Sequence, residues 1–415
     1  MKLLIKNIGE LIQVEIEIKD RVLGKKMKDL DTLKDAYLLI ENGLISDFGP
    51  MRDISKFLND SEMQIEDAKG GMVFPSWIDS HSHLVFASSR ESEFVDRIQG
   101  LSYQEIAQKG GGILNSAKKL SLTSEEELYQ SAAERLRDLI LMGTGAIEIK
   151  SGYGLSSESE LKMLRVIKRL KKDFPITIKS TFLGAHALPE KYSSDKESYL
   201  KLIEEEMLPK VVVEQLADYI DIFCEKDYFS VKDMERVVGA GKKLGLKPKV
   251  HVNQFNSIGG IPSAVKLGAL SVDHLEVMEW EDINSLKGSN TMATLLPSCS
   301  FFLNIPYAPA RIMIDEGLPV CLASDYNPGS TPSGNMNFVV SLACIQMKMS
   351  PEEAINAATV NGAYALGISK SEGSIAKGKK GNIFITKKIP SYAFLPYNFG
   401  HNIIQRVFIK GCEFN

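Results

Sequence analysis

Eight short apolar segments, separated by stretches with helical periodicity, constrain the fold of this chain more than any other feature of its sequence. The segments are residues 73–78, 145–149, 176–182, 219–223, 248–252, 270–274, 292–296 and 319–323. Between several of them, apolar residues recur every three or four positions, a spacing typical of helices that pack through one face. Strands that alternate with helices indicate βα units and a parallel sheet. Eight such units predict an α/β fold, a (β/α)8 barrel of the TIM type.

A doubly wound open sheet is the alternative fold, but no glycine-rich dinucleotide fingerprint follows an early strand of this chain. The two ends of the chain differ from its middle. Residues 1–70 and 372–415 contain short strand-like runs and turns, among them Asn42-Gly43, a good hairpin signal. We therefore predict that the two ends form one small β-sandwich domain and that residues 71–371 form the barrel.

Composition and charge narrow the possible partners and the compartment. The net charge of -4, without a basic stripe, gives no sign of a nucleic-acid partner. Charge interrupts the N-terminus too early for a signal sequence, and no apolar stretch reaches the roughly 20 residues that span a bilayer. Five scattered cysteines without a CxxC pair suit reduced thiols. We therefore expect a cytoplasmic protein that binds neither nucleic acid nor membrane.

The positions of the histidines predict a metal site. Five histidines and one aspartate lie at or just after the ends of predicted strands: His81, His83, His186, His251, His274 and Asp325. In a barrel these ends open on one face, where active sites are built. A mononuclear site of His81, His83, His251 and Asp325 fits one divalent metal, zinc or iron. His274 and Asp325 are then the candidates to take the proton from the attacking water.

The order of these ligands along the strands resembles the amidohydrolase superfamily. Residues 349–354, 357–363 and 373–379 are similar to its C-terminal signature, although Asn382 stands where many members have Asp. Within the superfamily the chain resembles the imidazolonepropionase family through residues 81–94, 109–113, 148–155, 181–189 and 322–330. That resemblance implies a hydrolase that opens the ring of 4-imidazolone-5-propanoate to give N-formimino-L-glutamate in histidine degradation. It also implies a small anionic substrate, one metal per chain and a homodimer.

The resemblance further implies roles for side chains around the metal. Arg90 would pair with the propionate carboxylate through its bidentate fork. His186 would act as a third catalytic residue by polarising the ring carbonyl or its tetrahedral successor. The remaining substrate contacts that we expect are Tyr103, Tyr153, His186, Gln254, Asn327, Gly329 and Ser330.

Gln254 marks a difference from part of the superfamily. Three residues after the histidine of the fifth strand, deaminase relatives often have a glutamate that shuttles protons. An amide orients a ligand but cannot take a proton. Gln254 therefore argues against a deaminase and leaves acid–base work to His274 and Asp325.

Three alternatives remain open from the sequence. The first is another amidohydrolase, acting on a different cyclic amide or as a deaminase. The second is a binuclear site bridged by a carboxylated lysine, for which Lys150 and Lys179 lie on barrel strands. The third is a non-catalytic scaffold, which would be expected to lose metal ligands, and none is missing here.

Overall fold

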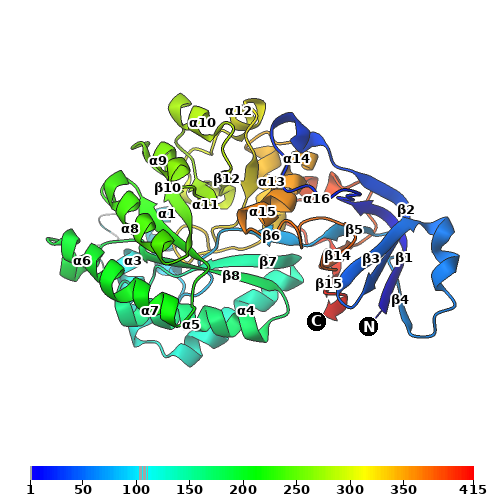
Figure 1. Cartoon of the computed structure of the whole chain (residues 1–415), viewed down its shortest axis with the longest axis horizontal. Helices are drawn as coiled ribbons and strands as arrows, with labels where there is room; N and C mark the ends of the chain where they lie inside the picture. Colours follow the sequence, from blue (N-terminus) through cyan, green and yellow to red (C-terminus); the bar gives the residue numbers. More distant parts are fainter. Residues whose placement is uncertain (1, 102–104, 106–108, 110) are drawn as a thin grey trace.

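The computed structural model describes residues 2–101, 105, 109 and 111–415. Within them the chain forms two sheets of eight strands each (Figure 1). One sheet is parallel throughout, and its strands follow one another in chain order from β6 to β13. The strands are β6 (Trp77–Asp79), β7 (Thr144–Lys150), β8 (Thr177–Ala185), β9 (Tyr219–Cys224), β10 (Lys247–Val252), β11 (Ser271–His274), β12 (Met292–Leu295) and β13 (Val320–Leu322). The predicted (β/α)8 barrel is confirmed.

The barrel closes just beyond the ends of its first and last strands. Ser82 and Tyr326 form a parallel bridge, the Asp325 amide donates to the carbonyl of His81 at 2.9 Å, and the His83 amide donates to the carbonyl of Tyr326 at 2.8 Å. The segments that complete the ring are therefore the ones that carry three of the expected metal ligands.

The second sheet is mixed and contains strands from both ends of the chain (Figure 1). Its order is β16-β15-β14-β5-β1-β2-β3, with β4 beside β1. The bounds are β1 (Lys2–Ile12), β2 (Thr32–Glu41), β3 (Leu44–Pro50), β4 (Met63–Asp67), β5 (Met72–Pro75), β14 (Ile383–Thr386), β15 (Ile404–Ile409) and β16 (Cys412–Phe414). The predicted hairpin is present, because Asn42 and Gly43, with φ of 52° and 82°, form the turn between β2 and β3.

The run expected as one strand, residues 73–78, is divided between the two sheets. Strand β5 pairs with β1 and β14 in the mixed sheet, whereas β6 pairs with β7 in the barrel. Pro75 ends β5, because proline has no amide hydrogen for a continuing ladder. Ser76 then donates to the carbonyl of Asn382, and Trp77 donates to that of Gly143. One residue thus joins the mixed sheet to the barrel.

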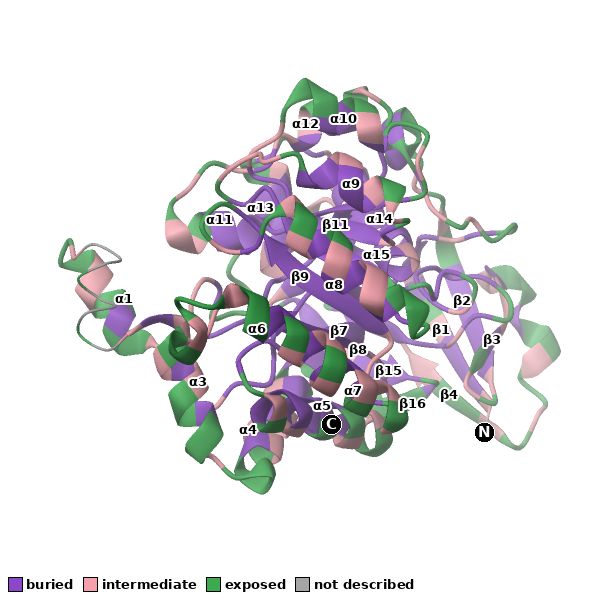
Figure 2. Ribbon diagram, turned by 60° about the vertical axis from the view of Figure 1, so that its left-hand side comes forward, coloured by how far each residue is buried: buried purple, intermediate pink, exposed green. Residues whose placement is uncertain are grey.

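Helices surround the barrel, with their exposed faces outward and the strands buried (Figure 2). Local signals start the longer ones: Ser124, Ser230 and Ser350 each form a capping box with the residue three positions on. The bounds are α1 (Glu91–Ile98), α3 (Gly112–Leu122), α4 (Glu125–Leu141), α5 (Ser157–Asp173), α6 (Lys196–Leu202), α7 (Leu208–Val213), α8 (Val231–Lys243), α9 (Gly260–Lys266), α10 (Trp280–Leu286), α11 (Pro297–Leu303), α12 (Ala310–Asp315), α13 (Met336–Ile345), α14 (Pro351–Ala358), α15 (Val360–Ala365) and α16 (Phe394–Tyr397). None of the described helices is both long and apolar enough to span a membrane.

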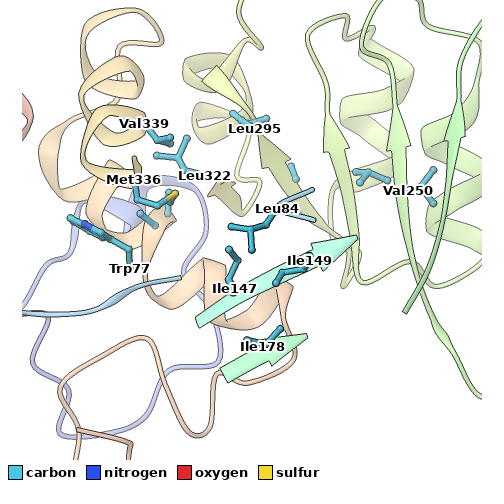
Figure 3. Packing of buried hydrophobic residues seen from close by; sticks show 14 of the residues in the cluster. Trp77, Leu84, Ile147, Ile149, Ile178, Val250, Leu295, Leu322, Met336 and Val339 are labelled. Atoms are coloured by element: carbon cyan, nitrogen blue, oxygen red, sulfur yellow. The ribbon is translucent and has the colours of Figure 1, made fainter. Parts of the chain in front are cut away.

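The largest apolar cluster of the described residues fills the space between the barrel and its helices. Figure 3 shows part of it, with Leu84, Ile147 and Val250 among the buried side chains. The same cluster includes Phe74 and Phe384 of the mixed sheet, whose rings stack at 5.1 Å between centroids. The two sheets therefore share a core, which fixes the barrel strands that carry the candidate site.

Candidate active site

The four expected metal ligands converge at the closing edge of the barrel. The Nε2 atoms of His83 and His251 lie 3.2 Å apart. Asp325 Oδ1 lies 3.5 Å from Nε2 of His81 and 3.7 Å from Nε2 of His83. All four side chains are buried. A left-handed φ of 55° at Asp325 turns its carboxylate toward the histidines.

Two buried carboxylates orient two of these histidines. His81 Nδ1 donates to Asp273 Oδ2 at 2.7 Å, and His251 Nδ1 donates to Asp221 Oδ2 at 2.7 Å. Each hydrogen bond places the proton on Nδ1 and leaves the lone pair of Nε2 facing the other ligands. Carboxylate–histidine pairs of this kind are the usual support of a protein metal site.

The donor set fits a divalent metal. Among the described residues, His81 Nε2 has no hydrogen-bond partner although it is buried. Burial and the Lys150 charge hold the pKa of His81 well below its usual range, so its imidazole is neutral, as metal binding requires. Burial and His186 do the same for the pKa of His83. Lone pairs that face one another in a dry site are unfavourable without a cation.

His274 lies beside this group on strained backbone. Its φ is 93° and that of Leu275 is 66°, values that residues other than glycine rarely adopt. Its Nδ1 lies 3.5 Å from Glu276 Oε1. Burial alone would lower the pKa of His274, but the carboxylates of Glu276, Asp325 and Asp273 raise it. His274 therefore has the character of a proton acceptor.

The structure also permits His274 as a metal ligand. Ligand atoms of His81, His274 and Asp325 all lie within 4.8 Å of one another, as do those of His81, His83 and His251. A third such group joins His274 and Glu276 to the buried thiol of Cys299. The choice between ligand and acid–base roles for His274 is testable by metal content.

A cavity of about 60 Å³ opens above the ligands. It is lined by His83, Tyr153, His186, Phe223, His251, Gln254, His274, Asp325, Asn327 and Ser330. Most of the expected substrate contacts therefore surround one space. A separate cavity of about 120 Å³, lined in part by His401, lies beside α13 and contains none of these residues.

The loop after β7 brings Tyr153 to the cavity, and it also holds His186, which follows the end of β8. His186 Nδ1 lies 3.0 Å from the carbonyl of Gly152 and must donate to it, because a carbonyl only accepts. A Cβ at Gly152 would lie 2.9 Å from His186 Nδ1, and φ there is 109°, so the position requires glycine. Glu160 holds the loop by accepting from the amides of Gly152, Gly154 and Leu155.

Arg90 lies at the start of α1, against the loop that follows β13. Its NH2 donates to Glu93 Oε2, and Glu93 Oε1 accepts from the Gly112 amide at 3.0 Å. A Cβ built on Gly329 would lie 2.3 Å from Arg90 NH1. Gly329 therefore contributes by its lack of a side chain, which lets the guanidinium lie over the loop.

Replacing Gly329 by alanine should displace Arg90 and raise KM without unfolding the chain. The added Cβ meets the far end of a flexible side chain, which moves more easily than backbone. Steady-state kinetics and a thermal melt measure the two effects. Gly239→Ala is the matched control, because nothing lies within 4 Å of a Cβ there. An unchanged KM in Gly329→Ala would contradict the expected role of Arg90 in binding the substrate carboxylate.

Asn327 and Ser330 lie in the same loop, but their side chains have different hydrogen-bond partners. Asn327 Oδ1 accepts from the amides of Gly329 and Ser330, and its Nδ2 donates to the carbonyl of Asp325, so it folds its own loop. Ser330 Oγ donates to Asp325 Oδ2 at 3.3 Å, and Thr331 Oγ1 does so at 3.4 Å. The loop thereby holds Oδ2 of Asp325 in place, while Oδ1 faces His81 and His83.

The remaining expected residues are placed as follows. Gln254 lines the cavity and donates to Cys299 Sγ at 3.4 Å. Lys179 is partly buried and pairs with Asp218 at 3.3 Å. Tyr103 lies outside the described residues.

Sequence reasoning missed the carboxylates behind the histidines, Asp221 and Asp273, together with Glu276 and Cys299. A usable signal existed for the first two, because each interrupts an apolar barrel strand. Charged residues are almost never fully buried without a partner, so each Asp required one. Cys299 follows Pro297 at the start of α11 and carries no comparable signal.

Comparison with known proteins places the chain in a family. The model of the amidohydrolase family matches residues 72–412. An imidazolonepropionase of Christiangramia forsetii is 60% identical over 411 residues, which cover 99% of each chain. That of Clostridium tetani is 45% identical over 388 residues, which cover 94% of this chain and 92% of the relative.

Solved structures with the same fold are more distant in sequence. A guanine deaminase from C. acetobutylicum with bound guanine superimposes with a TM-score of 0.72 at 16% identity, and all of each chain is covered. An adenosine deaminase from Xanthomonas campestris with bound zinc gives 0.71 at 15% identity, covering 99% of this chain and 92% of that one. At such identities these neighbours bear on the fold alone.

Proposed function

Since the chain belongs to the amidohydrolase family, we propose that it opens the ring of 4-imidazolone-5-propanoate by hydrolysis and yields N-formimino-L-glutamate in histidine degradation. The observation that carries the proposal is one cavity in which three of the four proposed metal ligands, His83, His251 and Asp325, meet His186 and Gln254, with ligand atoms of His81 within 4.8 Å of those of His83 and His251. Its imidazolonepropionase relatives, up to 60% identical among those compared, support the same reaction.

The metal would be held by His81, His83, His251 and Asp325, with one zinc or iron ion per chain. Nitrogen and oxygen ligands suit both ions, and zinc is bound by a protein of the same fold. When bound, the ion supplies a Lewis acid that polarises a carbonyl and lowers the pKa of water. The steps below concern the side chains of the protein.

His274 accepts the proton of the attacking water and delivers it to the leaving ring nitrogen. Its raised pKa makes it a stronger base than His81 and His83, whose pKa values are lowered. Asp325 lies close enough to His274 to contribute to the rise in its pKa, and the two residues share the proton transfer. Water attack on the ring carbonyl carbon and cleavage of its bond to nitrogen complete the hydrolysis.

His186 has a different role from the one expected from the sequence. Because Nδ1 donates to the Gly152 carbonyl, Nε2 of the neutral ring is an acceptor. Burial and the neighbouring His251 lower the pKa of His186 to about 3, so it stays neutral. We therefore assign it to accept a hydrogen bond from a ring N–H of the substrate, which orients the ring rather than stabilising an oxyanion.

Arg90 anchors the propionate tail. Replacing it by methionine should raise KM by about 10–100-fold, which corresponds to the ~1.5–3 kcal/mol of a hydrogen bond to a charged group. The rise should vanish for an analogue whose tail lacks the carboxylate, and this comparison is the control. An equal rise for both compounds would show that the substitution disturbs the site in general.

Gln254 favours ring opening over deamination, because its amide orients a ligand without accepting a proton. A spectrophotometric assay of imidazolone propionate loss, run beside an assay for ammonia release from purine and pyrimidine substrates, separates the two activities. We expect the first signal and not the second. Ammonia release without loss of imidazolone propionate would overturn the proposed function.

The homodimer and the cytoplasmic location stay predictions. Sedimentation of the purified chain measures the oligomeric state directly.

A further inference from the structure

A group of charged side chains is buried beneath the metal ligands, inside the barrel. Its members are Glu148, Lys150, Asp221, Lys249 and Asp273, and each is at most 1% exposed. Glu148 and Lys150 are two residues apart on β7, so both point to the barrel interior. Full burial of five charges is unfavourable unless they are paired.

Lys150 lies at the centre of this group. Its Nζ donates to Glu148 Oε1 at 2.7 Å and to Asp221 Oδ2 at 2.9 Å, and it lies 3.6 Å from Asp273 Oδ2. These two aspartate oxygens are the ones that accept from His251 and His81. One ammonium group therefore lies behind both carboxylate–histidine pairs.

The backbone of Lys150 is part of the same arrangement. Its amide donates to the carbonyl of Ser82, the residue between the two histidines of the His-x-His pair, at 2.9 Å. Burial alone would lower the pKa of Lys150, but Asp221, Glu148 and Asp273 raise it, so the side chain remains an ammonium. An ammonium that contacts three carboxylates is not available as a carboxylated bridge between two metals.

Lys249 offers a natural comparison within the same group. It is equally buried and pairs with Glu148 Oε2 at 2.7 Å, and it donates to the Ser80 carbonyl at 2.8 Å. It lies 3.9 Å from Asp273 Oδ2. It therefore shares the burial and charge of Lys150, but it lies near only Asp273 of the two carboxylates that hold the histidines, whereas Lys150 lies between both.

We propose that Lys150 is a positioning residue for the metal centre: by holding Asp221 and Asp273 together, it fixes the two histidines that they orient. This inference rests on the metal site of the proposed function. Removal of Lys150 leaves two buried carboxylates facing each other, and both hydrogen bonds to histidine loosen. The consequence is weaker metal binding rather than a lost catalytic step.

Lys150→Met in the full chain should weaken binding of Zn²⁺ by about 10–100-fold, the usual effect of removing support behind a ligand. Competition with a chromophoric chelator measures the dissociation constant without reference to activity. At saturating Zn²⁺, kcat should recover most of the wild-type value, because the atoms that react are unchanged. Lys249→Met, the matched control, should bind Zn²⁺ nearly as tightly as wild type.

Each other outcome has a defined meaning. If the wild-type chain itself binds no metal, the proposed function fails. If wild type binds Zn²⁺ and Lys150→Met binds it as tightly, or if Lys249→Met weakens binding equally, the role assigned to Lys150 is wrong. If Lys150→Met does not fold, Lys150→Gln, which keeps a donor of similar length, is measured instead. If neither Lys150 variant folds whereas Lys249→Met does, Lys150 is required for folding and the proposal is overturned.

Discussion

Replacing His274 by alanine lowers turnover by about 10²–10⁴-fold, the usual contribution of a general acid–base residue, while the metal content stays near that of wild type. The reason lies in the position of His274 beside the ligands and in the neighbouring carboxylates that raise its pKa. Turnover is measured by loss of imidazolone propionate, and metal content by elemental analysis of the purified chain.

His401→Ala is the control for this substitution, since that histidine is exposed and does not line the candidate site. Loss of stoichiometric metal from His274→Ala would instead make His274 a ligand. The spacing of His81, His274 and Asp325 allows that arrangement. The measurement therefore decides between two ligand sets that the positions of these side chains allow.

Removal of the metal by a chelator abolishes ring opening, and addition of Zn²⁺ or Fe²⁺ restores it. Mg²⁺ should not restore activity, because it prefers oxygen ligands and the site presents three imidazoles. The metal-free chain should also melt at a lower temperature. A ligand at 1,000 times its dissociation constant contributes about 4 kcal/mol to the free energy of unfolding.

Full activity after verified removal of the metal would refute the metal-dependent mechanism. A fall in melting temperature without loss of activity would assign the ion a structural role instead. The metal-free wild-type chain, in which His81, His83 and His251 are unchanged, is also the reference for Zn²⁺ binding in the Lys150 experiment.

The barrel and the convergence of its candidate metal ligands could be predicted because both depend on short-range patterns. Buried parallel strands form continuous apolar runs, and their ends in a barrel open on one face. Residues that immediately follow a strand, such as His83 and Asp325, therefore share that face whatever their separation along the chain. The left-handed φ at Asp325 and at His274 was not predictable, because it arises from strain that the surrounding structure imposes.

Contacts between strands far apart in sequence were the part that sequence reasoning could not supply. His81 contacts Asp273 across 192 residues, and nothing near His81 indicates that partner. The tautomer of His186 depends in the same way on the Gly152 carbonyl, and the acceptor role that we propose for His186 follows from that contact. Pro75 was the only sequence signal that indicated the division of residues 73–78 between two sheets.

The single residue between β5 and β6 has a consequence for how this protein can be altered. Ser76 is too short to act as a flexible linker, and the strand that leads to His81 and His83 begins directly behind it. Phe74, Trp77 and Phe384 pack together across that junction. The mixed sheet can consequently not be exchanged on its own. Replacing it by that of a relative would require replacing its half of the shared core as well. We also expect the two sheets to unfold as one cooperative unit.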